Sequence, residues 1–343
     1  METFDLTKVF VSKRPIEEST KGLFSGLKKR LRKRSVSITA VDHLNLRISE
    51  GEIFGLLGPN GAGKTTTVKM LCTLIEPTVG TAKVNGYDVV READKVREHI
   101  GALLEGERAL YWKLTGRENL HFYADLYHVP PRLAKERIKE LLSWIGLADR
   151  ADDTVEKYSK GMKQKLIIAK ALIHNPPILF LDEPTLGLDP NAARETREAL
   201  VGLKEKGQTI LLTTHYMEEA DRICDRVGII DQGKIIALGP PSELKRKLRG
   251  TDHIEMEVTR FLEGHLDKVK SLDLVGTATF DVADATTATG TLRVSTRDGR
   301  SLLPELISRL NELYVAVNFV RFSEPTLEDV FISLTGRRIK EGT

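Results

Sequence analysis

A glycine-rich stretch in the first quarter of the chain has the residue types and spacing of a phosphate-binding loop. It fits the pattern G-x-x-x-x-G-K-[ST] between an apolar run, residues 52–57, and a helical pattern. The matching residues are Gly58, Pro59, Asn60, Gly61, Ala62, Gly63, Lys64 and Thr65, with Thr66 next. Glycines let backbone N–H groups converge on phosphate oxygens, and the helix N-terminus adds positive potential. We expect Lys64 to contact the β- and γ-phosphates and Thr65 to offer its hydroxyl to Mg²⁺.

Two adjacent carboxylates follow a second apolar run, residues 178–181. If this run is a buried strand, Asp182 and Glu183 lie at the carboxyl edge of a sheet, where ligands of α/β proteins bind. Asp182 suits Mg²⁺ through its water shell, and Glu183 suits polarising the water that attacks a phosphate. Such a pair alone is more often a helix cap, but beside a phosphate loop the catalytic interpretation is favoured.

A histidine ends the next apolar run. His215 follows residues 208–214, and a single histidine at a strand end is usually structural. Its place one strand beyond Glu183 favours a contact with the γ-phosphate instead. The phosphate loop, the two carboxylates and this histidine together indicate a nucleoside triphosphatase, without indicating which work it drives.

The elements that must position these residues alternate between strands and helices. Apolar strands separated by helices predict an α/β protein with a parallel sheet covered on both faces. Residues 116–175 are mostly helical in pattern, and residues 227–238 predict a hairpin. The order βαββαβ beyond Gly250 predicts a small split-βαβ domain without a catalytic constellation. We therefore place one domain at 1–249, with a helical subdomain at about 105–175, and an accessory domain at 250–343.

Composition sets limits on the class of protein. A chain of 343 residues, 41% hydrophobic and 29% charged, is typical of a globular protein of two domains. Its apolar runs are far shorter than the roughly 20 residues needed to cross a bilayer, and no secretion signal begins the sequence. We expect a protein that is neither secreted nor integral to a membrane, with Cys72 and Cys224 as buried thiols.

A further motif narrows the class. Residues 158–164, Tyr-Ser-Lys-Gly-Met-Lys-Gln, open an apolar helix and resemble the Leu-Ser-Gly-Gly-Gln signature of ATP-binding-cassette (ABC) ATPases. Ser159 and Gly161 match, whereas Lys160 and Met162 depart from the pattern. Ser159 alone would be an ordinary helix N-cap, but the motif lies between the phosphate loop and the Asp-Glu pair, as in that family.

The resemblance covers residues 1–240 and implies further roles. Asp189 fills the D-loop position and His215 the position of the switch histidine. Phe10 aligns with the aromatic residue that stacks on adenine. Glu105 falls where the family has the Q-loop glutamine; a carboxylate can still bind Mg²⁺ but lacks the amide donor. In this family two cassettes dimerise head to tail, so Ser159 and Gly161 would serve the ATP of the partner.

The end of the chain indicates a branch of that family. Residues 325–336 resemble the ending of ATPases from drug-resistance exporters, which drive a separately encoded membrane permease. The resemblance implies an ATP- and Mg²⁺-dependent subunit at the cytoplasmic face of the membrane, paired with a second ATPase subunit in a homo- or heterodimer. Tyr111 and Trp112 are candidate contacts of the permease. Ordinary packing within the subunit is an alternative of equal weight.

A soluble ABC ATPase that acts on nucleic acid or ribosomes is the other class considered. Translation-linked members usually carry two cassettes in one chain, and DNA-repair members insert a long coiled coil before the signature. Here one cassette has about 100 residues between Gly58 and Ser159 and no heptads. Transport is therefore favoured, and no nucleic-acid partner is expected.

The net charge of +3 comes from one segment. Residues 21–34 hold seven Lys or Arg and no acid, inside an insertion at about 12–37. As a helix, this segment would group Leu23, Phe24, Leu27 and Leu31 on one face, and a basic amphipathic helix can lie on anionic lipid headgroups. The alternative is a solvated insertion. In an ATPase that works at a membrane, we expect contact with the bilayer or the permease.

Overall fold

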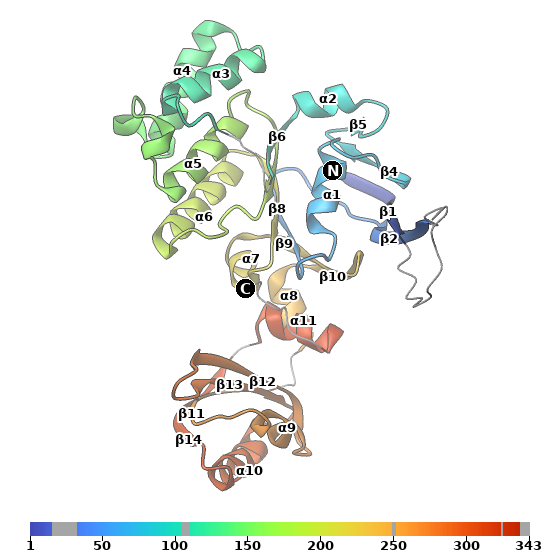
Figure 1. The fold of residues 1–343 in the computed structure, drawn as a ribbon, viewed down its shortest axis with the longest axis vertical. Coiled ribbons are helices and arrows are strands. Elements are labelled where there is room, and N and C mark those ends of the chain that lie inside the picture. Colours follow the sequence, from blue (N-terminus) through green and yellow to red (C-terminus); the bar gives the residue numbers. More distant parts are fainter. Residues whose placement is uncertain (16–32, 105–109, 249–251, 324, 337–343) are drawn as a thin grey trace, which may run out of the picture. The chain divides into compact units, whose positions relative to one another are not determined.

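The chain forms two compact units in a computed structural model (Figure 1), which describes residues 1–15, 33–104, 110–248, 252–323 and 325–336. The first unit is Met1–Gly239, and the second comprises the described residues from Pro240 onward. The sequence placed this division after residue 249. The difference is helix α8 (Pro241–Arg246), which belongs to the second unit because it packs against the C-terminal helix α11 (Leu327–Thr335).

A six-stranded sheet forms the centre of the first unit, in the order β10-β9-β3-β8-β7-β6. Strands β9, β3, β8, β7 and β6 run parallel to one another. Strand β10 pairs antiparallel with β9, as the predicted hairpin. Every residue of β3, β7 and β8 is buried, which confirms a parallel sheet covered on both faces. The strands are β3 (Ile53–Leu57), β6 (Ile100–Leu103), β7 (Ile178–Asp182), β8 (Thr209–Thr214), β9 (Arg226–Asp231) and β10 (Lys234–Gly239).

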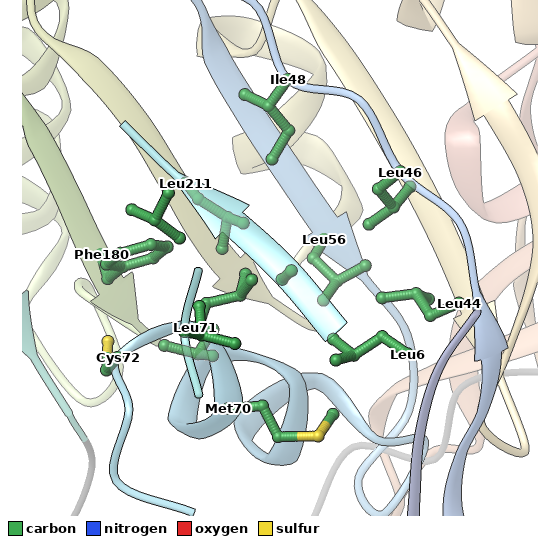
Figure 2. Packing of buried hydrophobic residues seen from close by; sticks show 14 of the residues in the cluster. Leu6, Leu44, Leu46, Ile48, Leu56, Met70, Leu71, Cys72, Phe180 and Leu211 are labelled. Carbon is green, nitrogen blue, oxygen red and sulfur yellow. The ribbon is translucent and has the colours of Figure 1, made fainter. Parts of the chain in front are cut away.

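A second, antiparallel sheet of four strands has the order β2-β1-β4-β5. Its strands are β1 (Glu2–Pro15), β2 (Lys33–Leu44), β4 (Val79–Val84) and β5 (Tyr87–Asp88). Leucines of this sheet and its loops pack with Leu56, Phe180 and Leu211 of the six-stranded sheet and with Met70 of helix α1 (Figure 2). This core fixes the start of α1 (Lys64–Leu71), where the phosphate loop ends.

The predicted insertion at about 12–37 has paired strands at both of its ends. Strands β1 and β2 pair antiparallel as far as Pro15 and Lys33, so residues 12–15 and 33–37 continue the two strands. The insertion itself stays a prediction. The basic segment 21–34 lies outside the described residues, apart from its last two positions in β2.

Helices α3, α5 and α6 of the first unit begin at residues whose side chains cap them. Thr115 and Glu118 form a capping box at α3, and Ser159 and Asp189 accept backbone N–H groups at the starts of α5 and α6. The remaining helices are α2 (Ala93–Glu98), α3 (Gly116–Leu126), α4 (Pro131–Trp144), the 3₁₀ turns η1 (Ala148–Arg150) and η2 (Val155–Lys157), α5 (Lys160–Ala171), α6 (Pro190–Glu205) and α7 (Met217–Ile223). Cys72 and Cys224 are buried, as expected.

The second unit has the predicted order βαββαβ after α8. Its antiparallel sheet has the order β12-β13-β11-β14, and one face packs on α9 and α10 through residues such as Met256, Leu292 and Leu306. The elements are β11 (Asp252–Thr259), α9 (His265–Lys270), β12 (Val275–Asp284), β13 (Thr289–Thr296), α10 (Gly299–Glu312), β14 (Ala316–Ser323) and α11.

Candidate active site

The loop between β3 and α1 is shaped by positions that admit only glycine. A Cβ at Gly58 would lie 2.2 Å from the carbonyl oxygen of Ile230, and one at Gly63 would lie 2.4 Å from that of Ala40. Gly63 also has a φ of 111°, which favours glycine. At both positions the loop lies so close to neighbouring backbone that a side chain larger than that of glycine would not fit.

Lys64 lies within the curve of this loop. Its side chain is 6% exposed, and its Nζ donates hydrogen bonds to the carbonyl oxygens of Gly58 at 2.7 Å and Pro59 at 3.3 Å. The same Nζ lies 3.4 Å from Oε1 of Glu183. The predicted phosphate-binding lysine and the predicted catalytic glutamate are therefore neighbours, although they are far apart in sequence.

Asp182 ends β7 beside the start of α1. It is 1% exposed, and its Oδ1 accepts hydrogen bonds from the hydroxyls of Thr65, at 3.2 Å, and Thr213. Its Oδ2 is buried and has no hydrogen-bond partner among the residues that the structure describes. A buried carboxylate oxygen normally has a partner. Thr65 and Asp182 thus fit a hydrated Mg²⁺, which usually takes one or two protein ligands together with substrate phosphates.

Glu183 and His215 form a buried pair at the same sheet edge. Oε2 of Glu183 lies 3.0 Å from Nδ1 of His215, and the two side chains are 7% and 9% exposed. Glu183 has a φ of 51°, a left-handed conformation that non-glycine residues rarely adopt and that needs support from the surroundings. Thr213 supplies part of this support, because its carbonyl and hydroxyl oxygens accept the N–H of Glu183 at 3.1 and 3.2 Å.

Sequence reasoning missed Thr213, which holds both carboxylate residues. The available signal was the pair Thr213 and Thr214 between the aliphatic residues 210–212 and His215. It also missed Glu219 on α7, which is 4% exposed; burial raises the pKa of its carboxyl above the ordinary value. A carboxylate on the buried face of a short helix gives no distinctive sequence pattern.

The other predicted residues lie at separate places in the first unit. Ser159 caps α5 by accepting the N–H of Met162 at 3.2 Å, and Gly161 is buried where a Cβ would lie 2.8 Å from that of Ala192. Asp189 caps α6 and is exposed. Of these three residues, Gly161 lies where α5 packs on α6, against Ala192.

Phe10 lies on β1, opposite Ile38 of β2, and is 44% exposed. Nζ of Lys8 lies 5.4 Å from the centre of its ring. The ring is therefore available for stacking on a base. Glu105, the residue expected at the Q-loop position, lies outside the described residues.

A glycine-shaped loop at the N-terminus of α1, with Asp182 and Glu183 at the end of β7 two strands along the same sheet, defines a P-loop nucleoside triphosphatase. Comparison with known proteins agrees with this class. The family model described as ABC transporter matches residues 41–186. Among solved structures, an ATP-binding subunit of an ABC transporter is 31% identical with a TM-score of 0.57, and the match covers 72% of this chain and 92% of that one. A dimeric ATP-binding cassette with ADP and phosphate is 25% identical with a TM-score of 0.57, and the match covers 70% and 97%.

Two curated relatives indicate the branch of this family to which the chain belongs. The chain is 37% identical over 303 residues to the linearmycin resistance ATP-binding protein LnrL of Bacillus subtilis, a match that covers 88% of this chain and 96% of the relative. It is 42% identical over 304 residues to the daunorubicin resistance ATP-binding protein DrrA3 of Streptomyces coeruleorubidus, with coverage of 88% and 93%. The chain belongs to the ABC transporter family, as an ATP-hydrolysing subunit of the drug-resistance exporter branch. None of the described helices combines the length and apolar character that a bilayer span requires.

Proposed function

We propose that this ATPase dimerises head to tail and drives a separately encoded permease that exports a drug-like small molecule. The observation on which this proposal mainly rests is that Glu183 lies between Lys64 and His215 at a buried sheet edge. The resistance functions in the names of its relatives support export. The work of the permease would place the ATPase at the cytoplasmic face of the membrane.

Each residue of the site has a proposed role in hydrolysis. Residues 58–66 bind the phosphates of ATP, and Lys64 exchanges its bonds to the loop carbonyls for bonds to phosphate oxygens. Thr65 and Asp182 hold Mg²⁺, which when bound offsets phosphate charge. Glu183 polarises the attacking water, and His215 orients Glu183 and contacts the γ-phosphate. Phe10 stacks on adenine, and Glu105 stays a proposed metal contact.

The exposed start of α5 supports the proposed dimer. A helix N-terminus is a favourable place for a phosphate group, and Ser159 stands at this one. In the dimer Ser159 and Gly161 serve the nucleotide of the partner subunit, and Asp189 takes the D-loop position. The solved cassette with ADP and phosphate is itself dimeric.

An exposed aromatic group on the helical part of the first unit supports contact with the permease. Tyr111, Trp112 and Phe122 are 49%, 62% and 40% exposed, and the rings of Tyr111 and Phe122 meet edge to face at 4.8 Å. Lys163 lies over the ring of Trp112 at 4.7 Å. Exposed aromatic residues are enriched at interfaces between proteins.

Co-expression with the permease encoded by the adjacent gene tests the transport proposal. We expect the permease to retain the ATPase in membranes and to raise its vanadate-sensitive activity, and Trp112→Ala to reduce both effects without changing the activity of the isolated ATPase. Failure of the chain to associate with any membrane protein would contradict the proposal.

The basic segment 21–34 is proposed to strengthen attachment to anionic lipid or to the permease. Its deletion should weaken membrane association and leave ATP binding unchanged. Unchanged association would favour a solvated insertion instead. Binding to RNA or DNA that weakens with salt would revive the nucleic-acid alternative.

A further inference from the structure

Helix α5 carries the signature residues at its N-terminus and lies beside the start of α6 (Figure 1). Four contacts join it to the segment that begins after Glu183. They are the hydrogen bond from Gln164 to Pro184, the approach of Lys160 to Gly187, the packing of Gly161 on Ala192, and the ion pair between Lys165 and Glu195. The first of these reaches the residue next to the proposed catalytic glutamate.

The bond from Gln164 completes the support of a strained turn. Glu183 has a left-handed backbone, and Thr213 of β8 holds its N–H from one side. The next residue, Pro184, has no N–H to donate, so its carbonyl is the group through which this residue can be held. Nε2 of Gln164 donates to that carbonyl oxygen at 2.6 Å. The turn is therefore held from β8 on one side and from α5 on the other.

A second contact joins the same helix to the D-loop. Lys160 stands where the family signature has a glycine, and its Nζ would lie 2.1 Å from a Cβ built at Gly187. Gly187 has a φ of 67°, a left-handed conformation that favours glycine. The helix start that would meet the nucleotide of the partner thus contacts the chain at two points between Glu183 and Asp189.

We propose that Gln164 is a positioning residue that sets the direction of the Glu183 carboxylate according to the position of α5. When the N-terminus of α5 engages a nucleotide across the dimer, any displacement of the helix reaches Pro184 through this hydrogen bond. The inference rests on the proposed role of Glu183 as the group that polarises water. It adds a link between the signature helix of a subunit and the catalytic glutamate of that same subunit.

Steady-state ATPase kinetics of Gln164→Leu test this proposal. Leucine has a similar volume but no donor, so we expect kcat to fall about 10- to 100-fold, the loss that a small misplacement of a reacting group produces. The KM for ATP should stay within about twofold of wild type, because the phosphate loop is untouched. Gln164→Lys keeps an N–H donor and should recover most of kcat. If Gln164→Leu does not fold, Gln164→Glu places a carboxylate against the carbonyl and should give the same loss.

Lys165→Met is the matched control. It removes the ion pair to Glu195, which joins the same two helices without touching Pro184. We expect a lower Tm and an unchanged kcat. An equal loss of kcat in Lys165→Met and Gln164→Leu would mean that helix docking alone matters, and would overturn the proposal. An unchanged kcat in Gln164→Leu would also overturn it.

The variant Glu183→Gln separates this inference from the role on which it rests. If Glu183→Gln keeps wild-type kcat, the proposed role of Glu183 is wrong, whatever Gln164 does. If Glu183→Gln is inactive yet binds ATP, the role stands, and Gln164→Leu alone decides the inference. In the double variant, Gln164→Leu should cause no further loss, because the carboxylate that it positions is gone.

Discussion

Thr213→Val removes the hydroxyl that joins the two carboxylate residues of the site. Thr213 is fully buried, and valine has nearly the same shape, so the change leaves no cavity. The hydroxyl donates to Oδ1 of Asp182, a bond to a charged group worth about 1.5–3 kcal/mol. It also accepts from the N–H of Glu183, which keeps its second bond to the Thr213 carbonyl. Loss of this weaker bond adds at most about 0.5 kcal/mol.

The expected decrease in the free energy of unfolding of the first unit is therefore about 1.5–3.5 kcal/mol. For a unit of this size it corresponds to a fall in Tm of about 3–14 °C. The carboxylate of Asp182 would lose one of its two oriented bonds, so the Mg²⁺ concentration for half-maximal activity should rise about tenfold or more, as when an outer partner of a metal ligand is removed.

Thermal unfolding and Mg²⁺ titration of ATPase activity measure the two effects. Thr209→Val is the control, because Thr209 lies at the other end of β8 and its hydroxyl accepts one backbone bond, from Gly51 at 2.9 Å. It should lower Tm without changing the Mg²⁺ dependence. If Thr213→Val unfolds like wild type and needs no more Mg²⁺, the hydroxyl does not hold Asp182 and the reasoning fails.

Two further predictions concern pH. Burial raises the pKa of Glu219 above its ordinary 4.5, so the folded protein binds this proton more tightly than the unfolded chain and loses stability as pH rises above 4.5. Glu219→Gln should raise Tm at pH 8, with a gain that shrinks towards pH 4.5; a constant difference would contradict this. Burial lowers the pKa of the His253 imidazole below its ordinary 6.5, although Asp329 lies 3.8 Å away. The unfolded chain therefore binds this proton more tightly than the folded protein, so the stability that the neutral imidazole allows is present above pH 6.5 and is lost as pH falls through the lowered pKa. His253→Gln should remove this loss of stability at low pH. If the second unit of His253→Gln unfolds in acid as readily as that of wild type, the prediction is wrong.

The sequence predicted those parts of the site that follow from strand ends. Asp182, Glu183 and His215 end neighbouring parallel strands, so the meeting of Glu183 with His215 and its approach to Lys64 follow from the sheet. Links through single side chains could not be predicted. Gln164 reaches Pro184 from another helix, and no local pattern specifies such a partner.

Two features were also beyond sequence reasoning, for physical reasons. Strands β1 and β2 continue into charged residues of the predicted insertion, because backbone pairing does not need an apolar pattern. The domain division was placed at Gly250 because this glycine closes a helical pattern. The packing of α8 on α11, near the other end of the second unit, decides the division instead.

The cap at the start of α5 limits which residue can stand at position 159. The oxygen of the Ser159 hydroxyl accepts the N–H of Met162, while its own hydrogen stays available to donate. Aspartate or asparagine would cap the helix as well. In the proposed dimer, however, an aspartate would repel a phosphate. Helix stability alone thus permits aspartate and asparagine besides serine, whereas the serine hydroxyl caps the helix and keeps a donor that can turn towards the nucleotide of the partner.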